Sequence, residues 1–335
     1  MNYIYAISFA LMLAAVLVEA VALKFTEEKS ISWLDLLFNM DSGHIVMWFF
    51  RGIEISGYTL IYRYSPFNMI SPEPSMFIWI LGFFAWDFGF YWLHRYHHKI
   101  KLLWAVHVVH HEGEHFNLSL GARNSWYSSI TSLPFFAPMA LIGINPVVFV
   151  GVSSIHYTVQ LYNHCGLIKN SGILDKFMIT PKHHRIHHGL NLEYVDKNFG
   201  GTFLVWDKLF GTFQKEIPHI PVQFGIKKPF GSLNPFWASH LPIMKFFGFH
   251  KVSVSTKKQK TSLSRILIYG LLSYAAAIWV ILSQPTIPFV FHLILVLIVC
   301  MQTVALGAMS EDRKWGEPSW LGMQVLLILV FFIFL

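Results

Sequence analysis

Histidines recur at helical spacing in three segments of the chain, and this pattern limits the possible folds more than any other feature. One segment reads H-x-x-x-H at 94–98, and two read H-x-x-H-H, at 107–111 and 184–188. In an α-helix, positions i, i+3 and i+4 lie on one face, about one turn apart. The spacing therefore predicts three helical segments whose eight imidazoles converge on a shared centre.

Eight imidazoles are more than one metal ion requires. A zinc site takes three or four protein ligands, so eight nitrogens indicate two ions, and imidazole is a suitable ligand for iron. We expect a ninth ligand from His164, which ends a long apolar stretch, whereas His156 fits a ligand and a buried, hydrogen-bonded residue equally well. The predicted metal ligands are His94, His98, His107, His110, His111, His164, His184, His187 and His188.

The composition indicates that this centre belongs to a membrane protein. Of the 335 residues, 54% are hydrophobic and only 13% are charged, which is too apolar for a soluble domain of this length. The formal charge of +7 is compatible with nucleic-acid binding. However, the basic residues lie on loops beside apolar spans, where they attract anionic lipid headgroups. We therefore expect a membrane and a lipid as partners, and no nucleic acid.

Apolar stretches predict an all-α fold, a polytopic membrane helical bundle. Residues 126–163 form one such stretch, in which Gly143-Ile144-Asn145-Pro146 is typical of the turn of a helical hairpin. Three parts are predicted: a transmembrane anchor and loop at 1–43, a catalytic region of membrane helices with a cytosolic cap at 44–250, and a basic linker with three transmembrane helices at 251–335. The other expected spans are residues 4–23, 44–62, 76–93, 266–282, 287–306 and 319–335.

The distribution of basic residues predicts the orientation of the bundle. Lysine and arginine crowd the histidine segments and the 251–265 linker, whereas the loops at 65–75 and 283–288 contain neither. Loops rich in these residues remain on the cytosolic side. We therefore expect a multi-pass integral membrane protein, in a bacterial inner membrane or the endoplasmic reticulum, whose di-metal site faces the cytosol.

Two residues near the predicted ligands are expected to orient them. Asp87 lies two helical turns before His94, and a carboxylate near the membrane is costly unless it is paired. We expect Asp87 to accept an N–H from an imidazole ligand or its neighbour; an ion pair with a nearby Arg or Lys is the alternative. His183, which precedes the first ligand of the third segment, is expected to be a supporting residue as well.

A competing motif overlaps the second histidine segment. His111-Glu112-Gly113-Glu114-His115 matches H-E-x-x-H, in which two helical histidines bind zinc and the glutamate is the general base of a metalloprotease. Gly113 weakens the helix that this motif requires, and a protease would leave the other histidine segments without a role. A membrane zinc metalloprotease acting through His111-Glu112-x-x-His115 is therefore the less favoured alternative.

Residues around the histidines carry a resemblance to a known family. They are Trp104-Ala105-Val106 before the second segment, Asn117-Leu118-Ser119 after it, Thr180-Pro181-Lys182 before the third, and Asp196-Lys197-Asn198-Phe199-Gly200 and Trp206-Asp207-Lys208-Leu209-Phe210-Gly211-Thr212 beyond it. With the histidines, they resemble the fatty acid hydroxylase/sterol desaturase superfamily, and within it the alkylglycerol monooxygenases, which cleave ether lipids. The resemblance covers roughly residues 40–215. His115 departs from the family pattern, where an acidic residue is expected, but lies outside the ligand set.

The resemblance implies a membrane-bound di-iron monooxygenase that uses O₂ on C–H bonds of a lipid, with the nine histidines above as ligands. It implies two iron ions as cofactors, and tetrahydrobiopterin or an external electron-transfer protein as the electron donor. O-alkylglycerol ether cleavage is the specific activity expected, with sterol or fatty acid desaturation or hydroxylation as alternatives from the same superfamily. Glu114, Asn117 and Arg123 are weak candidates for a polar headgroup or pterin pocket, and a hydrogen-bond network explains them equally well.

Outside the enzymes, a membrane scaffold or metal carrier remains as a further class. It predicts metal binding without turnover, whereas a zinc protease predicts one metal ion and an essential Glu112. The oxygenase predicts two ions per chain and oxygen consumption.

Overall fold

The computed structural model describes residues 2–26, 32–67, 74–249, 261–283 and 286–334. Within them the regular structure is helical, apart from one antiparallel bridge between Met178 and Phe203. Two compact units are present. The terminal unit comprises residues 1–49, 122–125 and 230–335, and the histidine unit comprises 50–121 and 126–229. The predicted all-α class is confirmed, and the nine predicted ligands all lie in the histidine unit.

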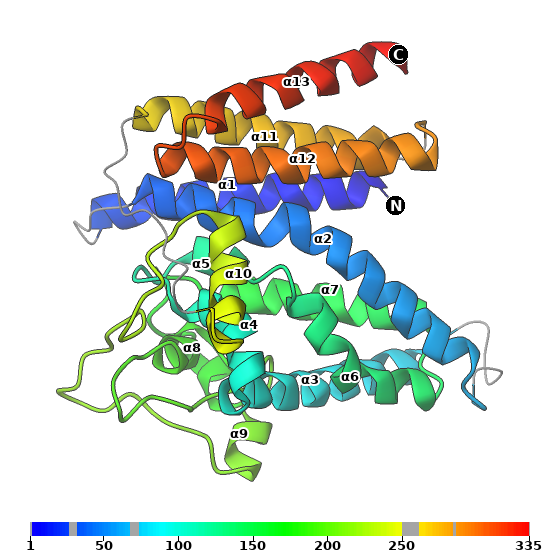
Figure 1. Ribbon diagram of the computed structural model, residues 1–335. Coiled ribbons are helices and arrows are strands. Elements are labelled where there is room, and N and C mark those ends of the chain that lie inside the picture. The colour runs from blue at the N-terminus through cyan, green and yellow to red at the C-terminus, as the bar shows by residue number, and fades with distance from the viewer. Residues whose placement is uncertain (1, 27–31, 68–73, 250–260, 284–285, 335) are drawn as a thin grey trace. The chain divides into compact units, whose positions relative to one another are not determined.

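The histidine unit is built around one long helix. Helix α3 (Met76–Lys99) packs against α4 (Lys101–His111), α6 (Ser128–Leu141) and α7 (Pro146–Asn163), as Figure 1 shows. The second half of α2 (Trp33–Arg63) also belongs to this unit. Its shorter elements are α5 (Leu118–Ala122), a 3₁₀ turn (Gly172–Lys176), α8 (Pro181–His187) and α9 (Val205–Leu209).

Helices α6 and α7 form the predicted hairpin. Gly143 lies between them at a φ of +86°, and a Cβ at this position would lie 2.7 Å from the carbonyl oxygen of Phe67. Only glycine adopts this conformation and tolerates this approach without strain. Asn145 then caps α7, because its side chain accepts a hydrogen bond from the Val147 N–H at 2.7 Å. Glycine and asparagine thus determine where one helix ends and the next begins.

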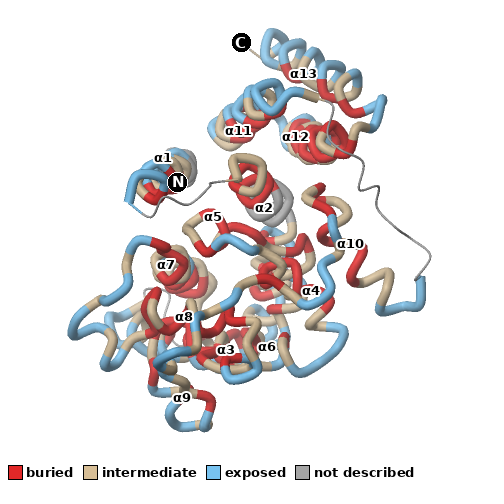
Figure 2. The backbone as a smooth tube through the Cα atoms, turned by 90° about the vertical axis from the view of Figure 1, so that its left-hand side faces the viewer, coloured by how far each residue is buried: buried red, intermediate tan, exposed pale blue. Residues whose placement is uncertain are grey.

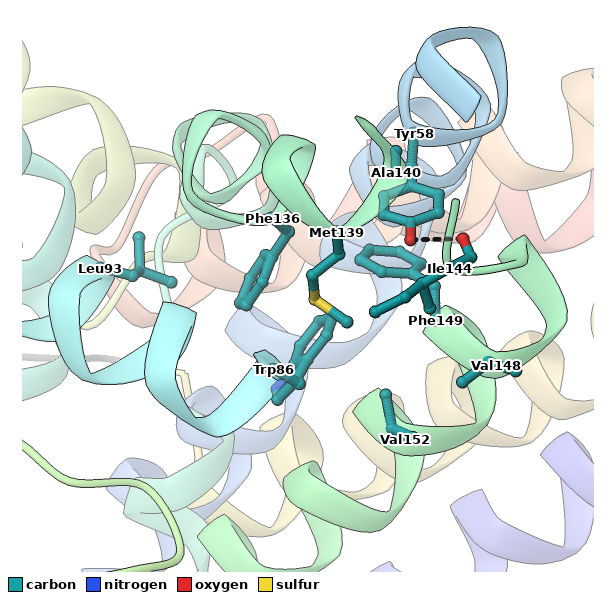
Figure 3. Close-up of a cluster of buried hydrophobic side chains, with 10 residues drawn as sticks. All are labelled: Tyr58, Trp86, Leu93, Phe136, Met139, Ala140, Ile144, Val148, Phe149 and Val152. Carbon is teal, nitrogen blue, oxygen red and sulfur yellow. Dashed lines mark hydrogen bonds between the residues drawn. The ribbon is translucent and has the colours of Figure 1, made fainter. Parts of the chain in front are cut away.

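An aromatic core fixes α3 against the hairpin (Figure 3). Trp86 stacks on Phe136, and Tyr58 stacks on Phe149, each pair with ring centroids 3.8 Å apart. Such pairs contribute about 0.5–1.5 kcal/mol each beyond the apolar area that they bury. Leu93 belongs to the same cluster, and the next residue of α3 is the first predicted metal ligand. The packing therefore holds the end of α3 where the ligands begin.

A buried ion pair connects the helices of this unit. Arg51 pairs with Glu54 one turn further along α2. Arg51 also donates to the Ser153 hydroxyl at 2.6 Å, and Glu54 accepts from the Ser132 hydroxyl at 2.5 Å. Removing charges from water is costly unless their remaining hydrogen bonds are satisfied. The two serines supply these bonds and connect α2 to α7 and α6.

The terminal unit is built from six helical segments of the described chain. They are α1 (Asn2–Thr26), the first part of α2, α10 (Pro235–Phe246), α11 (Leu263–Ser283), α12 (Phe289–Ser310) and α13 (Gly316–Ile333). Helix α12 packs against α10, α11 and α13, and α11 packs against α1 (Figure 1). The Trp320 indole donates to the Ser273 hydroxyl at 2.8 Å, which satisfies a polar group between α13 and α11.

Four helices of the described chain are long and apolar enough to cross a membrane: α3, α11, α12 and α13. Side chains such as Val325, Leu329 and Phe332 are exposed on α13, and Figure 2 shows this exposure along the helix. These apolar surfaces are suited to lipid, and the chain is a multi-pass membrane protein. Helices α1 and α2 cover the first two predicted spans, but the side chains of residues 2–9 and 42–49 are not described. The linker residues 251–260 lie outside the described residues, and the three-part division stays a prediction.

Candidate metal centre

The first five predicted ligands come from two consecutive helices. His94 and His98 lie at i and i+4 on α3, and three more histidines follow on α4. The chain changes direction at Ile100, whose extended backbone (φ −99°, ψ 119°) separates the helices and lets α4 pack back on α3. Both helices therefore present their histidines to the same space.

The other four come from helix ends further along the chain. His164 is the C-cap residue of α7. Pro181 occupies the first turn of α8, where its fixed φ suits a helix start. His184 and His187 follow within this helix, and His188 caps it.

The structure brings all nine histidines together in two groups. Each histidine contributes one ring nitrogen to its group, and the nitrogens of one group all lie within 4.8 Å of one another. The five-histidine group consists of His94, His98, His107, His111 and His187. The four-histidine group consists of His110, His164, His184 and His188.

Adjacent histidines on one helix belong to different groups. Helix α4 contributes the i, i+4 pair His107 and His111 to the five-histidine group, and His110 to the other. The third segment does the opposite, because His184 and His188 join the four-histidine group and His187 joins the five-histidine group. The groups also touch, since the rings of His111 and His188 lie 4.4 Å apart and are nearly parallel. Each H-x-x-H-H motif thus serves both groups.

The ring nitrogens meet at distances that suit shared metal ions. The Nε2 atom of His111 lies 3.1–3.2 Å from Nε2 of His98, His107 and His187. In the other group, Nε2 of His164 lies 3.0–3.2 Å from Nε2 of His110, His184 and His188. Two nitrogens that bind one ion with bonds of about 2.1 Å lie roughly 3.0–3.4 Å apart.

The tautomers support the same interpretation. Nδ1 of His187 faces the carbonyl oxygen of Lys197 at 2.8 Å, and Nδ1 of His164 faces that of Gln160 at 2.7 Å. A carbonyl only accepts, so each Nδ1 carries the proton and each Nε2 presents a lone pair inward. Several inward lone pairs cannot satisfy one another, whereas a cation among them would satisfy all. The residues therefore fit two metal ions, one in each group.

Burial keeps the imidazoles in the form that binds metal. It lowers the pKa of His107, His111 and His184 far below the ordinary value, and the neighbouring imidazoles lower it further. Burial also lowers the pKa of His164, to about 4. These rings are neutral at physiological pH, and a neutral imidazole is the metal ligand.

A loop segment that we call the collar, residues 196–199, orients three members of the five-histidine group. The acceptors are the Asp196 carboxylate for Nδ1 of His98 (3.3 Å), the Lys197 carbonyl for His187 (2.8 Å) and the Phe199 carbonyl for His94 (2.9 Å). Hydrogen bonds from His98 and Lys99 lower the pKa of Asp196 to about 2, so it remains a carboxylate. Partners of this kind fix the tautomer and the direction of a metal-binding imidazole.

Two buried carboxylates hold the collar and the loop that follows it. Asp207 accepts from the backbone N–H groups of Phe199 and Gly200 at 2.8 and 2.7 Å. Burial raises the pKa of Asp207 to about 6, although these hydrogen bonds favour the carboxylate. Asp87 accepts from the Thr202 N–H at 2.7 Å and from the Trp206 indole at 2.8 Å. The loop is therefore tied to α3 and to α9.

The four-histidine group is supported more locally. His164 donates to the Gln160 carbonyl of its own helix, one turn earlier. A Cβ on Gly121 would lie 3.0 Å from Nδ1 of His164, so this glycine leaves room for the ring. Within the described residues, Nδ1 of His184 is buried without a hydrogen-bond partner.

Asp87, His156 and His183 lie near the two groups but outside both. Nε2 of His156 is 3.2 Å from the Asp87 carboxylate, so Asp87 contacts this imidazole rather than one of the nine. His156 is fully buried and lies outside both groups. The ring of His183 is hydrogen-bonded to Thr180 at 3.1 Å. A direct contact between His183 and a member of either group is not observed among the described residues.

The weak cofactor candidates have structural contacts. Asn117 caps α5, because its side-chain oxygen accepts from the Ser119 N–H at 2.9 Å and the Ser119 hydroxyl at 2.6 Å. Arg123, in the terminal unit, donates to the side-chain oxygen of Asn39 at 3.2 Å. Glu114 is exposed. Asn117 and Arg123 thus make hydrogen bonds within the protein, and a role of these three residues in a cofactor pocket stays a prediction.

The H-E-x-x-H motif does not lie on one helix. Helix α4 ends at His111, and Glu112 is its C-cap residue. His115 is exposed in the bend that follows and belongs to neither histidine group. The helical geometry of a zinc protease is therefore missing.

The functional residues that the sequence did not reveal are the acceptors of the collar. Asp196, Lys197 and Phe199 lie within a stretch that carried the family resemblance, but two of them act through backbone carbonyls. The side-chain type at such a position gives no signal. Asp196 and Asn198, with φ angles of +61° and +53°, mark an unusual turn at this position.

Comparison with known proteins supports the relationship that the motifs indicate. Residues 79–212 match the family described as fatty acid hydroxylase. The chain is 39% identical over 188 residues to alkylglycerol monooxygenase from Homo sapiens, and 38% identical over 185 residues to that from Danio rerio. It is 31% identical over 142 residues to an ornithine lipid hydroxylase from Rhizobium tropici.

These matches cover part of each protein. The human match spans 56% of this chain and 41% of the relative, the Danio rerio match 55% and 40%, and the Rhizobium tropici match 42% and 43%. The chain thus aligns with about two fifths of the length of these relatives. No solved structure matches the chain significantly. The matched family segment, residues 79–212, contains all nine grouped histidines and the collar.

Proposed function

Because residues 79–212 match the fatty acid hydroxylase family, we propose that this chain is a membrane-bound di-iron monooxygenase of lipids from the fatty acid hydroxylase/sterol desaturase superfamily. The observation that carries the proposal is the pair of histidine groups, in which nine imidazoles place their ring nitrogens close together around two foci. Two iron ions held there would supply the oxidising chemistry that activates O₂ and cleaves an unactivated C–H bond.

The residues of the chain then have defined tasks. The imidazoles hold the ions, and the collar keeps three of them in one orientation, so little reorganisation accompanies the reaction. Phe199 contacts the rings of His94, His98 and His187 at 5.1–5.8 Å and shields this side of the five-histidine group from water. A substrate C–H bond must approach from a remaining open side.

A lipid substrate is consistent with the place of the ligands on the fold. Helix α3 is apolar enough to span a membrane, and its last turns carry His94 and His98. An alkyl chain in the bilayer would therefore lie close to the histidine groups while its headgroup stays at the interface. This arrangement brings the substrate to the centre without extraction into water.

For the specific reaction we propose cleavage of O-alkylglycerol ethers, the substrates named by several of the relatives. One atom of O₂ enters the C–H bond next to the ether oxygen, and two electrons and two protons reduce the other atom to water. The resulting hemiacetal breaks its C–O bond to give an aldehyde and glycerol. Tetrahydrobiopterin, or an external electron-transfer protein, supplies the electrons.

Hydroxylation or desaturation of another lipid is the second candidate. The ornithine lipid hydroxylase at 31% identity favours it, and so do two sterol-related relatives, a cholesterol 25-hydroxylase-like protein and lathosterol oxidase, at 29% and 24%. All these reactions start with removal of a hydrogen atom, so the same ligands serve each. We further propose that the centre faces the cytosol, in a bacterial inner membrane or the endoplasmic reticulum.

The decisive experiment combines metal counting with product analysis. The purified protein in lipid nanodiscs should contain two irons and, with O₂ and a reductant, convert an alkylglycerol to an aldehyde. His107→Ala should abolish turnover, because this residue lies inside the five-histidine group. Glu112→Gln should retain it, whereas a zinc protease would lose all activity with this change and bind one metal ion.

The substrate choice is tested separately by feeding alkylglycerol, sterol and ornithine lipid to cells with and without the protein, followed by lipid mass spectrometry. Unchanged ether lipid together with a new hydroxylated or desaturated lipid would replace ether cleavage by the second candidate. Absence of iron from active protein would contradict the di-iron proposal itself.

A further inference from the structure

The histidine unit contains a cavity of about 620 Å³ that the proposed reaction does not use. Helix α8 contributes residues to this cavity and to the two histidine groups. Its residues His184 and His187 belong to the histidine groups, whereas His183 and Ile186 line the cavity on a neighbouring face. This volume lies within the range of about 300–1,000 Å³ that is usual for small-molecule sites.

The cavity has a buried floor and an open rim. The floor is formed by His183 and Ile186, which are 5% and 1% exposed. Lys215, Glu216 and His219 line the rim and are exposed. A molecule that reached the floor would therefore be largely removed from water.

Two successive hydrogen bonds determine which ring nitrogen of His183 carries the proton. The Thr180 hydroxyl lies 2.7 Å from the Asp175 carboxylate and donates its proton there. It can then only accept from Nδ1 of His183, at 3.1 Å, so Nδ1 carries the ring proton. Nε2 of the neutral ring is consequently an acceptor, and no group of the described chain donates to it.

The walls favour an apolar and uncharged occupant. Phe213, Ile217 and Ile220 contribute apolar surface between the floor and the rim. The charged residues of the lining balance, because Lys182 and Lys215 oppose Asp175 and Glu216. Nε2 of His183 has no donor within the described chain, so a molecule with a matching donor can form a hydrogen bond with it inside the cavity.

We propose that this cavity binds a small, neutral, largely apolar heterocycle that donates an N–H hydrogen bond to Nε2 of His183. The site goes beyond the proposed function and involves neither the metal ions nor the lipid substrate. Since α8 lines the cavity and also carries His184 and His187, a molecule bound in the cavity would restrain the helix that holds these two histidines.

The test uses two probes that differ in one hydrogen-bond donor. Indole has an N–H, whereas 1-methylindole has nearly the same shape and no donor. Binding of each to the full-length protein in phosphatidylcholine nanodiscs is measured by ligand-observed NMR, with empty nanodiscs as the background. We expect indole to bind about tenfold more tightly, the factor for one typical hydrogen bond.

Three variants show where the preference arises. His183→Phe should bind both probes equally, because the acceptor is lost and an aromatic ring remains. His115→Phe, an exposed control outside the cavity, should retain the tenfold preference. Ile217→Trp fills the cavity from its wall and should abolish binding of both probes above background.

The proposal is overturned if the unaltered protein binds both probes equally, or if the preference persists in His183→Phe. If His183→Phe does not fold, the test depends on Ile217→Trp. Unchanged binding of the probes by that variant would show that they do not bind in this cavity. None of these binding measurements requires iron or turnover, so their outcome is independent of the oxygenase proposal.

Discussion

The five-histidine group and the four-histidine group share helices but differ in what holds their rings. Three members of the five-histidine group donate to the collar, residues 196–199, which is remote in sequence from His94 and His98. In the four-histidine group, His164 donates to a carbonyl of its own helix. One site therefore depends on a tertiary loop, and the other depends mainly on local helix geometry. The two should respond differently to the same kinds of change.

The largest expected effect comes from removing one ligand from each group. His184→Ala leaves three imidazoles in the four-histidine group, whereas His107→Ala leaves four in the five-histidine group. Because structural sites commonly hold metal with four ligands, His184→Ala should lower the metal content from two ions to about one per chain. His107→Ala should lower it much less. Elemental analysis of the purified variants, with His115→Ala as control, measures both.

Loss of both ions in His184→Ala, or equal loss in the two variants, would mean that the groups do not bind metal separately. Retention of two ions in His184→Ala would mean that this histidine is not needed to hold an ion.

The next effect tests how far the collar depends on Asp207. In Asp207→Asn the side chain has one acceptor oxygen left for the N–H groups of Phe199 and Gly200. Hydrogen bonds to a buried charge contribute about 1.5–3 kcal/mol each, so we expect unfolding to become easier by about 3 kcal/mol. Metal affinity should fall in the five-histidine group alone. Chemical denaturation and a chelator titration give the two values, and equal weakening of both ions would contradict the collar's selectivity.

Asp196→Asn isolates a single contact of the collar. Asparagine tolerates the φ of +61° at this position, so the backbone should keep its course. The variant replaces the charged acceptor of His98, and such partners contribute about 10–100-fold to metal affinity. We expect a loss near tenfold at one ion in a competition titration. Lys99→Ala removes the other partner of Asp196 and should change affinity less; a larger effect there would assign the role to the lysine.

The smallest effect is expected from Gly121→Ala. The added methyl group would lie 3.0 and 3.1 Å from Nδ1 and Cγ of the His164 ring and should tilt the ring slightly. Crowding of this kind costs about 1 kcal/mol, or about fivefold in affinity, and should appear only in the four-histidine group. Gly52→Ala, where nothing lies within 4 Å, is the matched control. A change at the five-histidine group instead would show that His164 supports the other ion.

The sequence alone was sufficient to find the histidines that meet in space. Their helical periodicity places them on common faces whatever the tertiary structure, and the structure brings all nine predicted residues into two groups. The hairpin was predictable for a similar reason, because Gly143 and Asn145 act through local backbone geometry and capping. Patterns of this kind depend only on residues a few positions apart.

Interactions that depend on tertiary approach could not be predicted. Asp87 was expected to accept an N–H from an imidazole ligand or its neighbour, but the sequence did not indicate that it would contact His156 and a loop more than a hundred residues later. The Phe199 carbonyl that orients His94 is a backbone atom, present at every residue. The sorting of His110 and His111 into different groups depends on how α4 packs, which spacing along one helix does not determine.

The alternation of neighbouring histidines between groups also bears on how such a centre can change over time. Shifting α8 by one residue would rotate its side chains by about 100° and move His187 and His188 out of both groups together. Sliding or replacing α4 or α8 would therefore change the surroundings of both ions, because each carries ligands of both groups. A change confined to one ion therefore requires substitution of single histidines rather than movement of either of these two helices.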